Sequence, residues 1–275
     1  MTARKQAVER PRIYSHEYYD RIRKLEEGHW WYAGMREIAA ALLRSQCGTG
    51  TLPRVLDAGC GTGAAMAWVR TAVGASRVTG MDVSAYALGF CRGRGEQSLA
   101  QCSVTAMPFR DACVDLVLCN DVLQHLATDG GDAGALKEVF RLLRPGGLAL
   151  LRTNSRFGRS GGARVDTDFQ HYDLGQLVDR VRGAGFVVRR ASHANMLPLL
   201  YALLKGWLAG LRSSGRGHHH GTLCKGLDIR EDILNRRWLN RLLLFVLVRE
   251  AQYLSRSNRS LPFGHTIVCL ALKPR

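Results

Sequence analysis

The sequence has no long apolar segment. Its longest uninterrupted apolar run covers residues 242–248, far short of the roughly 20 residues that a bilayer-spanning helix needs. Residues 1–12 are polar and charged, and no apolar stretch of the kind found in secretion signals follows them. We therefore expect a cytoplasmic protein, and peripheral contact with the inner face of a membrane stays open as an alternative.

Paired or clustered cysteines are also lacking. The eight cysteines are scattered, with no C-x-x-C pair and no histidine at the spacing of a zinc site. Several lie within apolar stretches, where a thiol behaves as a small hydrophobic side chain. His218, His219 and His220 lie among glycine, serine and arginine, which favours a basic loop over a metal site. The pattern predicts reduced, structural cysteines and no metal.

Acidic residues are sparse in the C-terminal part of the chain. Residues 152–275 contain 21 Lys and Arg against 8 Asp and Glu, whereas residues 1–151 contain 18 against 15. The formal net charge of +16 is therefore concentrated C-terminally. Such a distribution attracts an anionic partner, and a solvated basic surface is the equally weighted alternative.

Short apolar runs alternate with amphipathic segments between residues 51 and 194. The pattern predicts strands at 54–57, 77–81, 114–119, 148–152 and 186–191, and helices at 64–73, 85–92, 135–143 and 174–184. Proline and glycine in 144–147 end one helix and lead into the strand 148–152. This alternation is typical of right-handed βαβ crossovers in a doubly wound, mostly parallel α/β sheet.

Helical segments flank this α/β unit. Helices are predicted at 16–27, 34–46, 198–211 and 229–254, and a last strand at 265–272. We divide the chain into an N-terminal helical cap (1–50), a cofactor-binding domain (51–194), a helical insertion or lid (195–262) and the final strand of the sheet (263–275). The apolar helices of the insertion are expected to cover the substrate cleft, a second subunit of a homodimer or a membrane surface.

A glycine-rich turn follows the first strand of the α/β unit. Gly59 and Gly61 lie where the backbone must turn sharply and let a ligand approach without interference from a Cβ atom. The dinucleotide pattern G-x-G-x-x-A also fits, with Ala64 as its last residue. Asp57 decides against it, because a carboxylate there would repel a pyrophosphate but suits a cationic amino-acid group. Asp82 ends the second strand, where a carboxylate can accept both hydroxyls of a ribose.

These residues and the motifs that follow them resemble one enzyme family. The stretches L-D-A-G-C-G-T-G (56–63), G-M-D-V-S (80–84), M-P-F (107–109) and L-R-P-G-G (143–147) occur in the order typical of class I S-adenosylmethionine (SAM)-dependent methyltransferases, in the type 11-like branch. The resemblance covers roughly residues 50–190, and H-W-W-Y (29–32) is similar to an aromatic signature of a bacterial subset. It implies a Rossmann-like, seven-stranded sheet with SAM as cofactor.

The resemblance also implies which residues bind the cofactor. Asp57 would contact the amino group of the methionine part, Asp82 the ribose, and Asn120 the junction between cofactor and substrate. The family commonly has an aspartate near position 103; here Ser103, or the N–H of Val104, would replace it. The full set that we expect at the cofactor is Asp57, Gly59, Cys60, Gly61, Gly63, Asp82, Val83, Ser103, Val104 and Asn120.

Candidates for catalysis follow the fourth strand and end the loop 153–172. Methyl transfer needs in-line approach, exclusion of water and, for a hydroxyl acceptor, a base. His125 matches a histidine common in this branch, and both a base and a helix-positioning hydrogen bond are open roles for it. His171 and Tyr172 close the loop, and Tyr172 resembles a loop-ending tyrosine of relatives. The catalytic candidates are therefore His125, His171 and Tyr172.

Substrate contacts are expected from the aromatic stretch and from the same loop. Trp30, Trp31 and Tyr32 would cap the cofactor and line the substrate pocket, with simple packing of the N-terminal helices as the alternative. Arg156 and Arg164 would bind an anionic acceptor, with a solvated loop as the alternative.

The acceptor class follows partly from a motif that is lacking. Residues 120–123 read N-D-V-L, without the [DN]-P-P-[FY] box with which related enzymes hold the planar amino group of a nucleobase or glutamine. Nucleic acid is therefore not expected as the acceptor. We expect methylation of an oxygen or nitrogen of a small molecule, in secondary or cell-envelope metabolism. A lipid-linked or carrier-bound acceptor, and a non-catalytic SAM-binding protein, are the alternatives.

Overall fold

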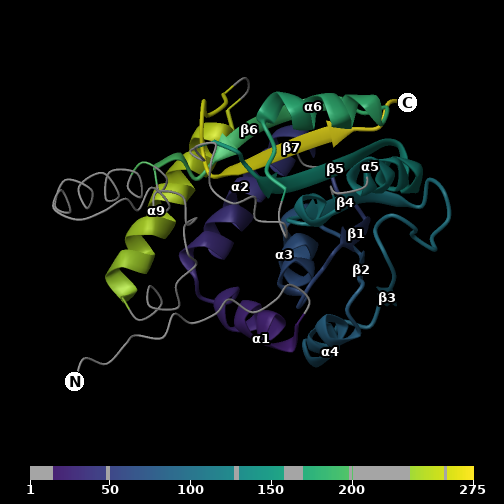
Figure 1. Cartoon of the computed structure of the whole chain (residues 1–275), viewed down its shortest axis with the longest axis horizontal. Helices are drawn as coiled ribbons and strands as arrows, with labels where there is room; N and C mark the ends of the chain where they lie inside the picture. The colour runs from purple at the N-terminus through teal and green to yellow at the C-terminus, as the bar shows by residue number, and fades with distance from the viewer. Residues whose placement is uncertain are drawn as a thin grey trace, which may run out of the picture.

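A seven-stranded mixed sheet forms the centre of the molecule (Figure 1). The computed structural model describes residues 15–47, 50–126, 130–157, 170–197, 200, 236–256 and 259–275. Within these ranges the strand order is β3-β2-β1-β4-β5-β7-β6. The strands are β1 (Arg54–Ala58), β2 (Arg77–Asp82), β3 (Leu99–Gln101), β4 (Val114–Asn120), β5 (Leu143–Asn154), β6 (Val187–Ala194) and β7 (Thr266–Leu272).

Helices cover both faces of this sheet (Figure 1). They are α1 (His16–Leu25), α2 (Trp30–Cys47), α3 (Ala64–Val73), α4 (Ala85–Gly93), the 3-10 turn η1 (Leu123–His125), α5 (Gly131–Leu142), α6 (Leu174–Gly183) and α9 (Arg237–Leu254). The core on one face includes Ile38 of α2, Val69 of α3 and Leu254 of α9. The core on the other face includes Val139 of α5 and Val181 of α6. Both faces are therefore buried, as parallel sheets require.

The strand pairing confirms the prediction of a doubly wound, mostly parallel sheet. β3, β2, β1, β4 and β5 pair in parallel, whereas β7 lies antiparallel between β5 and β6. The direction of the winding reverses between β1 and β4. Open sheets of this kind bind ligands outside the carboxyl ends of their strands at such a switch point. The carboxyl ends of β1, β2 and β4 therefore define where the functional site lies.

Some element boundaries differ from the prediction. α2 begins at Trp30 instead of residue 34, so the aromatic stretch belongs to the first turn of a helix. β5 begins at Leu143 instead of residue 148, because Leu143 already pairs with Val114 of β4; pairing resumes at Leu148 opposite Leu116, with an irregularity at residues 144–147. β3 and η1 were not predicted, since three residues are too few to show a period.

The predicted insertion 195–262 is described mainly through α9. Most of the predicted helix 198–211 lies outside the described residues, as do residues 229–235 of the predicted helix 229–254. α9 packs along α2, and its buried Glu250 accepts the N–H of Asn195 at 2.8 Å, beside the end of β6. Among the helices in the described ranges, none combines the length and apolar character of a membrane span. That this insertion forms a lid stays a prediction.

The contact between α2 and α9 depends on a glycine. A Cβ atom at Gly34 would lie 2.3 Å from Cδ1 of the buried Leu247, closer than two carbon atoms can approach. The two helices therefore pack at this distance because residue 34 has no side chain.

We predict that Gly34→Ala destabilises the protein by about 1–3 kcal/mol, the typical cost of overpacking a filled core. Gly89 of α4 provides the matched control, because a Cβ atom there would meet no neighbouring heavy atom within 4 Å. Gly89→Ala should stabilise the protein by up to about 1 kcal/mol through its higher helix propensity. Urea unfolding measures both effects, and a stabilising effect at both positions would contradict the packing argument.

Candidate functional site

The glycine-rich turn joins β1 to α3 at the switch point of the sheet. Gly59, Gly61 and Gly63 have positive φ angles of 81°, 53° and 87°, which side chains other than glycine rarely adopt. A Cβ atom at Gly59 would lie 2.3 Å from Val122, whereas one at Gly61 would have nothing within 4 Å. Gly59 is therefore needed for packing, and Gly61 leaves open space in which a ligand can lie against the backbone.

The end of β2 fixes the shape of this turn. The N–H groups of Gly59 and Cys60 both donate to the carbonyl of Met81, each at 2.8 Å. The N–H of Gly61 donates to Oδ2 of Asp82 at 2.9 Å. These donors already have protein partners, so a ligand at the turn would contact its surface without taking hydrogen bonds from these three N–H groups.

Asp57 is a buried carboxylate with an unpaired oxygen. The side chain is almost fully buried, and its Oδ2 has no hydrogen-bond partner within the described structure. Burial, together with the nearby Asp82 and against the opposing effect of Arg152, raises the pKa of Asp57 to about 7. A buried, unpaired carboxylate is unfavourable unless a cation or donor joins it. Asp57 therefore fits a cationic ligand group.

Asp82 is held by three parts of the chain. Besides Gly61, its carboxylate accepts the N–H of Ser84 at 2.9 Å, at the start of α4. The phenol of Tyr19, on α1, donates to its Oδ1 at 3.3 Å. The carboxylate that sequence analysis placed at a ribose therefore also joins β2, α4 and α1.

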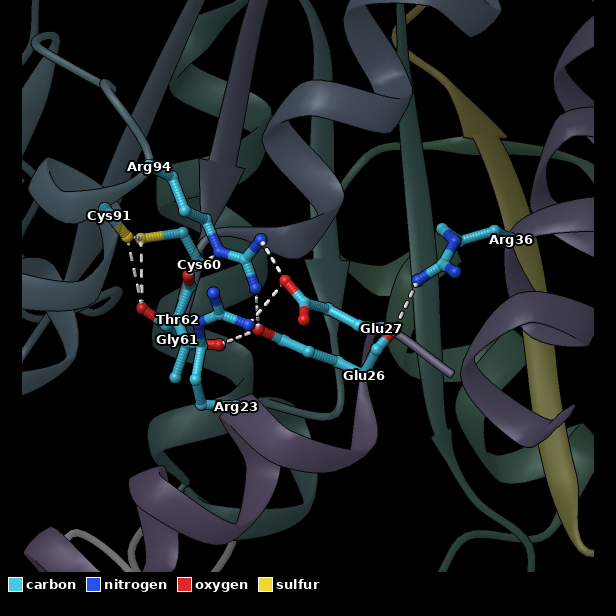
Figure 2. A network of polar contacts seen from close by, with 9 residues as sticks. All are labelled: Arg23, Glu26, Glu27, Arg36, Cys60, Gly61, Thr62, Cys91 and Arg94. Atoms are coloured by element: carbon cyan, nitrogen blue, oxygen red, sulfur yellow. Dashed lines mark hydrogen bonds and ion pairs between the residues drawn. The ribbon is translucent and has the colours of Figure 1, made fainter. Parts of the chain in front are cut away.

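A second polar cluster fixes the far side of the turn (Figure 2). The hydroxyl of Thr62 donates to Oε1 of Glu26, just after α1. Arg94, just after α4, donates to the same oxygen at 2.6 Å and to the carbonyl of Thr62 at 2.9 Å. Burial nevertheless raises the pKa of Glu26 above its ordinary value. The turn is thus gripped by residues that are 36 and 32 positions away from Thr62.

Two thiols lie beneath the turn. The sulfurs of Cys60 and Cys91 are 3.8 Å apart, and the thiol of Cys91 is 3.3 Å from the carbonyl oxygen of Gly61 (Figure 2). Both cysteines are buried and unoxidised, in line with their predicted structural role.

The residues expected at an adenine lie along the edge between β2 and β3. Val83 is 47% exposed, which leaves its side chain accessible to a ligand ring. Val104 is buried. The hydroxyl of Ser103 lies 2.8 Å from that of Thr105 and accepts the N–H of Thr105, so it closes a local turn. The Ser103 hydroxyl is therefore engaged within the chain at the position where the resemblance implies an aspartate.

The carboxyl ends of β4 and β5 bring a cation, a carboxylate and an aromatic ring together. Asn120 ends β4 opposite Arg152 of β5. Arg152 donates to Oδ2 of Asp121 at 2.5 Å, and its guanidinium lies 4.9 Å from the ring centre of Trp31. Asp121 has a φ of 59°, a strained conformation that is found mostly where a side chain must be aimed. This cluster adjoins the predicted junction between cofactor and substrate.

The three catalytic candidates are placed differently. Tyr172 is fully buried; its hydroxyl donates to Oδ2 of Asp132 at 2.8 Å and burial raises its pKa. Arg180 also pairs with Asp132, so Tyr172 anchors the end of its loop inside the core instead of facing a ligand. His125 ends η1, and His171 precedes Tyr172; both are partly exposed.

The aromatic residues Trp30, Trp31 and Tyr32 also differ from one another in their surroundings. Trp30 is 1% exposed, and its backbone N–H donates to Oδ1 of Asn240 on α9 at 2.8 Å, so it packs between helices. Trp31 and Tyr32 face the Arg152 cluster, with their rings edge to face at 4.9 Å. Burial, with help from Asp121, raises the pKa of Tyr32. Trp31 and Tyr32 therefore lie at the Arg152 cluster, whereas Trp30 lies between helices. That these aromatic residues contact a substrate stays a prediction.

The predicted arginines of the loop 153–172 are only partly described. Arg156 is exposed and lies 3.6 Å from Asp173, and Arg164 lies outside the described residues. The prediction that both bind an anion stays a prediction.

Sequence analysis missed Glu26, Arg94 and Arg152. Arg152 directly follows the apolar run of β5, as Asp82 closes the run of β2, so the same strand-end reasoning could have found it. Glu26 and Arg94 belong to no motif and lie far from the turn in sequence. Only the packing of α1 and α4 brings them to Thr62.

Comparison with known proteins relates this geometry to one class of enzyme. A family described as methyltransferase domain matches residues 56–151. A methyltransferase of Encephalitozoon cuniculi is 30% identical over 171 residues, covering 55% of this chain and 77% of that protein. A malonyl-[acyl-carrier protein] O-methyltransferase of Erwinia pyrifoliae is 35% identical over 215 residues, covering 70% and 76%. An S-adenosylmethionine-dependent methyltransferase of Mycolicibacterium smegmatis is 29% identical over 168 residues, covering 60% of this chain and 62%, less than two thirds, of that relative.

Solved structures share the fold at lower identity. One is a chain of the complex between the Haloferax volcanii Trm112 methyltransferase activator and a methyltransferase, with a TM-score of 0.60 at 18% identity, covering 97% of this chain and all of that one. Another is phosphoethanolamine N-methyltransferase 2 of Haemonchus contortus with bound SAM, with a TM-score of 0.59 at 18% identity, covering 95% and 58%.

The buried Asp57 makes a prediction about stability against pH. Because its pKa is raised from 3.8 to about 7, the folded chain binds the proton more tightly than the unfolded chain. Stability is therefore lost as the pH rises from about 4 to 7. Asp57→Asn, which cannot ionise, should gain about 2 kcal/mol of stability relative to wild type between pH 5 and pH 8.

Denaturant unfolding at both pH values measures this difference. Glu37→Gln, at an exposed carboxylate of α2, is the control and should leave the difference between the two pH values unchanged. An Asp57→Asn variant whose stability runs parallel to wild type across this range would show that Asp57 ionises normally.

Proposed function

This chain belongs to the class I SAM-dependent methyltransferases, and on that premise we propose that it transfers the methyl group of SAM to an oxygen or nitrogen of an anionic small molecule. The family and the relatives support SAM as the cofactor. When bound, SAM supplies an electrophilic methyl group carried on a sulfonium. Secondary or cell-envelope metabolism is the setting that we propose for the acceptor.

The described residues fit this cofactor. The unpaired oxygen of Asp57 would receive the cationic amino group of the methionine part, which would offset the cost of burying this carboxylate. The open space at Gly61 would admit the ligand against the turn. Asp82 would hold the ribose, and the exposed Val83 would cover one side of the adenine. We retain Asn120 as the residue at the junction with the acceptor.

The observation that carries the acceptor class is the cluster of Arg152, Asp121 and Trp31 beside Asn120. A guanidinium that is stacked on an indole and paired with one carboxylate is preorganised to bind an anion. Trp31 and Tyr32 would exclude water and restrict the space to a small acceptor. We propose that Arg152 binds an anionic group of the acceptor and that Trp31 positions Arg152.

Catalysis is proposed to rest on positioning, with His125 or His171 as the base if the acceptor is a hydroxyl. Both side chains are partly exposed and follow strands that end at the site. The buried, hydrogen-bonded hydroxyl of Tyr172 is unsuited to proton transfer, so Tyr172 is left out of this proposal.

The proposal predicts specific binding of SAM and of its demethylated product, S-adenosylhomocysteine (SAH). We expect a Kd of about micromolar and no comparable binding of NADH. Asp82→Ala should weaken SAH binding about 10- to 100-fold, because the ribose would lose a charged acceptor and the turn its anchor at Gly61. Asp111→Ala, which removes an exposed carboxylate remote from the site, should leave binding unchanged. Calorimetry measures the Kd of SAH for wild type, Asp82→Ala and Asp111→Ala.

Transfer itself is tested with methyl-labelled SAM and fractionated cell extract. We expect the label in a small, anionic product that wild type forms and Asp82→Ala does not. Binding of SAM without any labelled product would favour a non-catalytic SAM-binding protein.

A lipid-linked or carrier-bound acceptor is the second candidate, and the outer face of α9 favours it. Trp238, Leu242 and Phe245 recur at helical spacing and are 67%, 50% and 60% exposed. Arg241 and Arg249 lie exposed on the same face, and Glu250, the one carboxylate of α9, is buried. Exposed aromatic and basic residues on one helix face suit a surface of anionic lipids. The malonyl-[acyl-carrier protein] relative supports the carrier-bound form.

The second candidate predicts binding to vesicles of phosphatidylcholine that contain phosphatidylglycerol, and weak binding to phosphatidylcholine alone. Replacing Arg241 and Arg249 by Gln should reduce flotation with the anionic vesicles several-fold, at roughly 1 kcal/mol per basic residue. Replacing the exposed Arg92 and Arg189 by Gln removes the same charge elsewhere and is the control. Absence of flotation, together with methylation of a malonyl carrier protein, would favour the carrier-bound form instead.

A further inference from the structure

The hydrogen bonds around Asp82 leave too few acceptor sites for a ribose. A carboxylate offers about four lone-pair sites, two on each oxygen. Oδ1 accepts the N–H of Ser84 and the hydroxyl of Tyr19, and Oδ2 accepts the N–H of Gly61. One site remains, on Oδ2. The two neighbouring hydroxyls of a ribose need two, one on each oxygen.

Of the three donors, Tyr19 is the one that can give way. The N–H groups of Gly61 and Ser84 belong to the backbone of the turn and of the start of α4, so they cannot move without unfolding those segments. The Tyr19 bond is also the longest, at 3.3 Å against 2.9 Å for the other two. Burial, together with Asp82, raises the pKa of Tyr19, so its hydroxyl stays protonated and can act as a donor. The nearby Ser84 side chain offers the hydroxyl another partner.

We propose that the Tyr19 hydroxyl and a ribose hydroxyl of the cofactor compete for Oδ1 of Asp82, so that Tyr19 is a latch which the cofactor must displace. This inference rests on Asp82 binding the ribose, the role proposed above. Without the cofactor, the Tyr19 hydroxyl supplies a hydrogen bond to the buried carboxylate of Asp82. The cofactor must break this bond, so its apparent affinity is lowered by the free energy of the bond.

The rest of α1 is held independently of this latch. Asp20 accepts the hydroxyl of Tyr86, on α4, at 3.0 Å, and the rings of His16 and Tyr86 stack at 3.9 Å. At the other end, Glu26 is bonded to Thr62 and Arg94 (Figure 2). Displacement of the latch is therefore a local movement of the Tyr19 side chain, while α1 stays on the domain.

The sign of one substitution tests the proposal. Tyr19→Phe keeps the ring and removes the competing donor, so SAH should bind about three- to tenfold tighter, the net worth of one ordinary hydrogen bond, as suits a bond as long as 3.3 Å. Tyr86→Phe removes the phenol hydroxyl that joins α4 to Asp20 of α1, the same chemical change made away from Asp82. Its Kd for SAH should stay within about twofold of wild type. Calorimetry measures both.

Equal or weaker SAH binding by Tyr19→Phe would overturn the proposal, because the hydroxyl would then be neutral or a ligand of the cofactor. Equal tightening by Tyr86→Phe would overturn it too, since loosening α1 would suffice. Wild type that fails to bind SAH would contradict the proposed function and the latch together, whereas wild type that binds with no gain in Tyr19→Phe contradicts the latch alone.

A measurement on wild type covers the case in which Tyr19→Phe does not fold. We would compare SAH with its 2′-deoxy and 3′-deoxy forms. For one of the two, the loss of affinity should stay below about threefold, because Tyr19 donates to Asp82 in place of the missing hydroxyl. Losses beyond about tenfold for both analogues would show that Tyr19 does not replace either hydroxyl.

Discussion

The carboxylate of Asp82 is the point at which four segments of this molecule meet. It closes β2, accepts a backbone bond from the glycine-rich turn and another from the start of α4, and takes the phenol of Tyr19 from α1. Since an ionised carboxylate binds donors about twice as strongly as a neutral acceptor, it can fix the turn and still serve a ligand. The site geometry depends on this side chain, because it is the shared partner of the turn, of the start of α4 and of Tyr19 on α1.

The site contains buried carboxylates whose ionised forms are unfavourable, and a cationic cofactor group would reduce this cost. Asp57 and Glu26 are both buried, and burial raises the pKa of each. Glu26 is compensated within the protein by Arg94 and Thr62, and its role is to hold the turn. One oxygen of Asp57 has no such compensation in the described structure. The difference separates a carboxylate used for structure from the one that we propose binds a ligand, although both are buried.

The cluster of Arg152, Asp121 and Trp31, which we propose binds the acceptor, is stabilised in a different way. Arg152 pairs with one oxygen of Asp121, and Trp31 stacks on the guanidinium, so the cluster is ordered and partly buried within the folded chain. The α2 helix that carries Trp31 is in turn packed on α9 through Gly34 and through Trp30 and Asn240. The same helix α2 therefore packs on α9 and carries Trp31 of the cluster that we propose binds the acceptor.

Sequence alone determined the order of the α/β elements, the glycine-rich turn, and the strand-end positions of Asp57, Asp82 and Asn120. These features are local: the periodicity of apolar residues and the conformational freedom of glycine are written in neighbouring positions. Tertiary structure alone placed Glu26 and Arg94 against Thr62, and Arg152 against the ring of Trp31. It also placed Trp30 between helices, whereas Trp31 lies at the Arg152 cluster. It also buried Tyr172, which sequence had suggested for catalysis. Such contacts join residues 30 or more positions apart, so they depend on how helices pack, which no local pattern records.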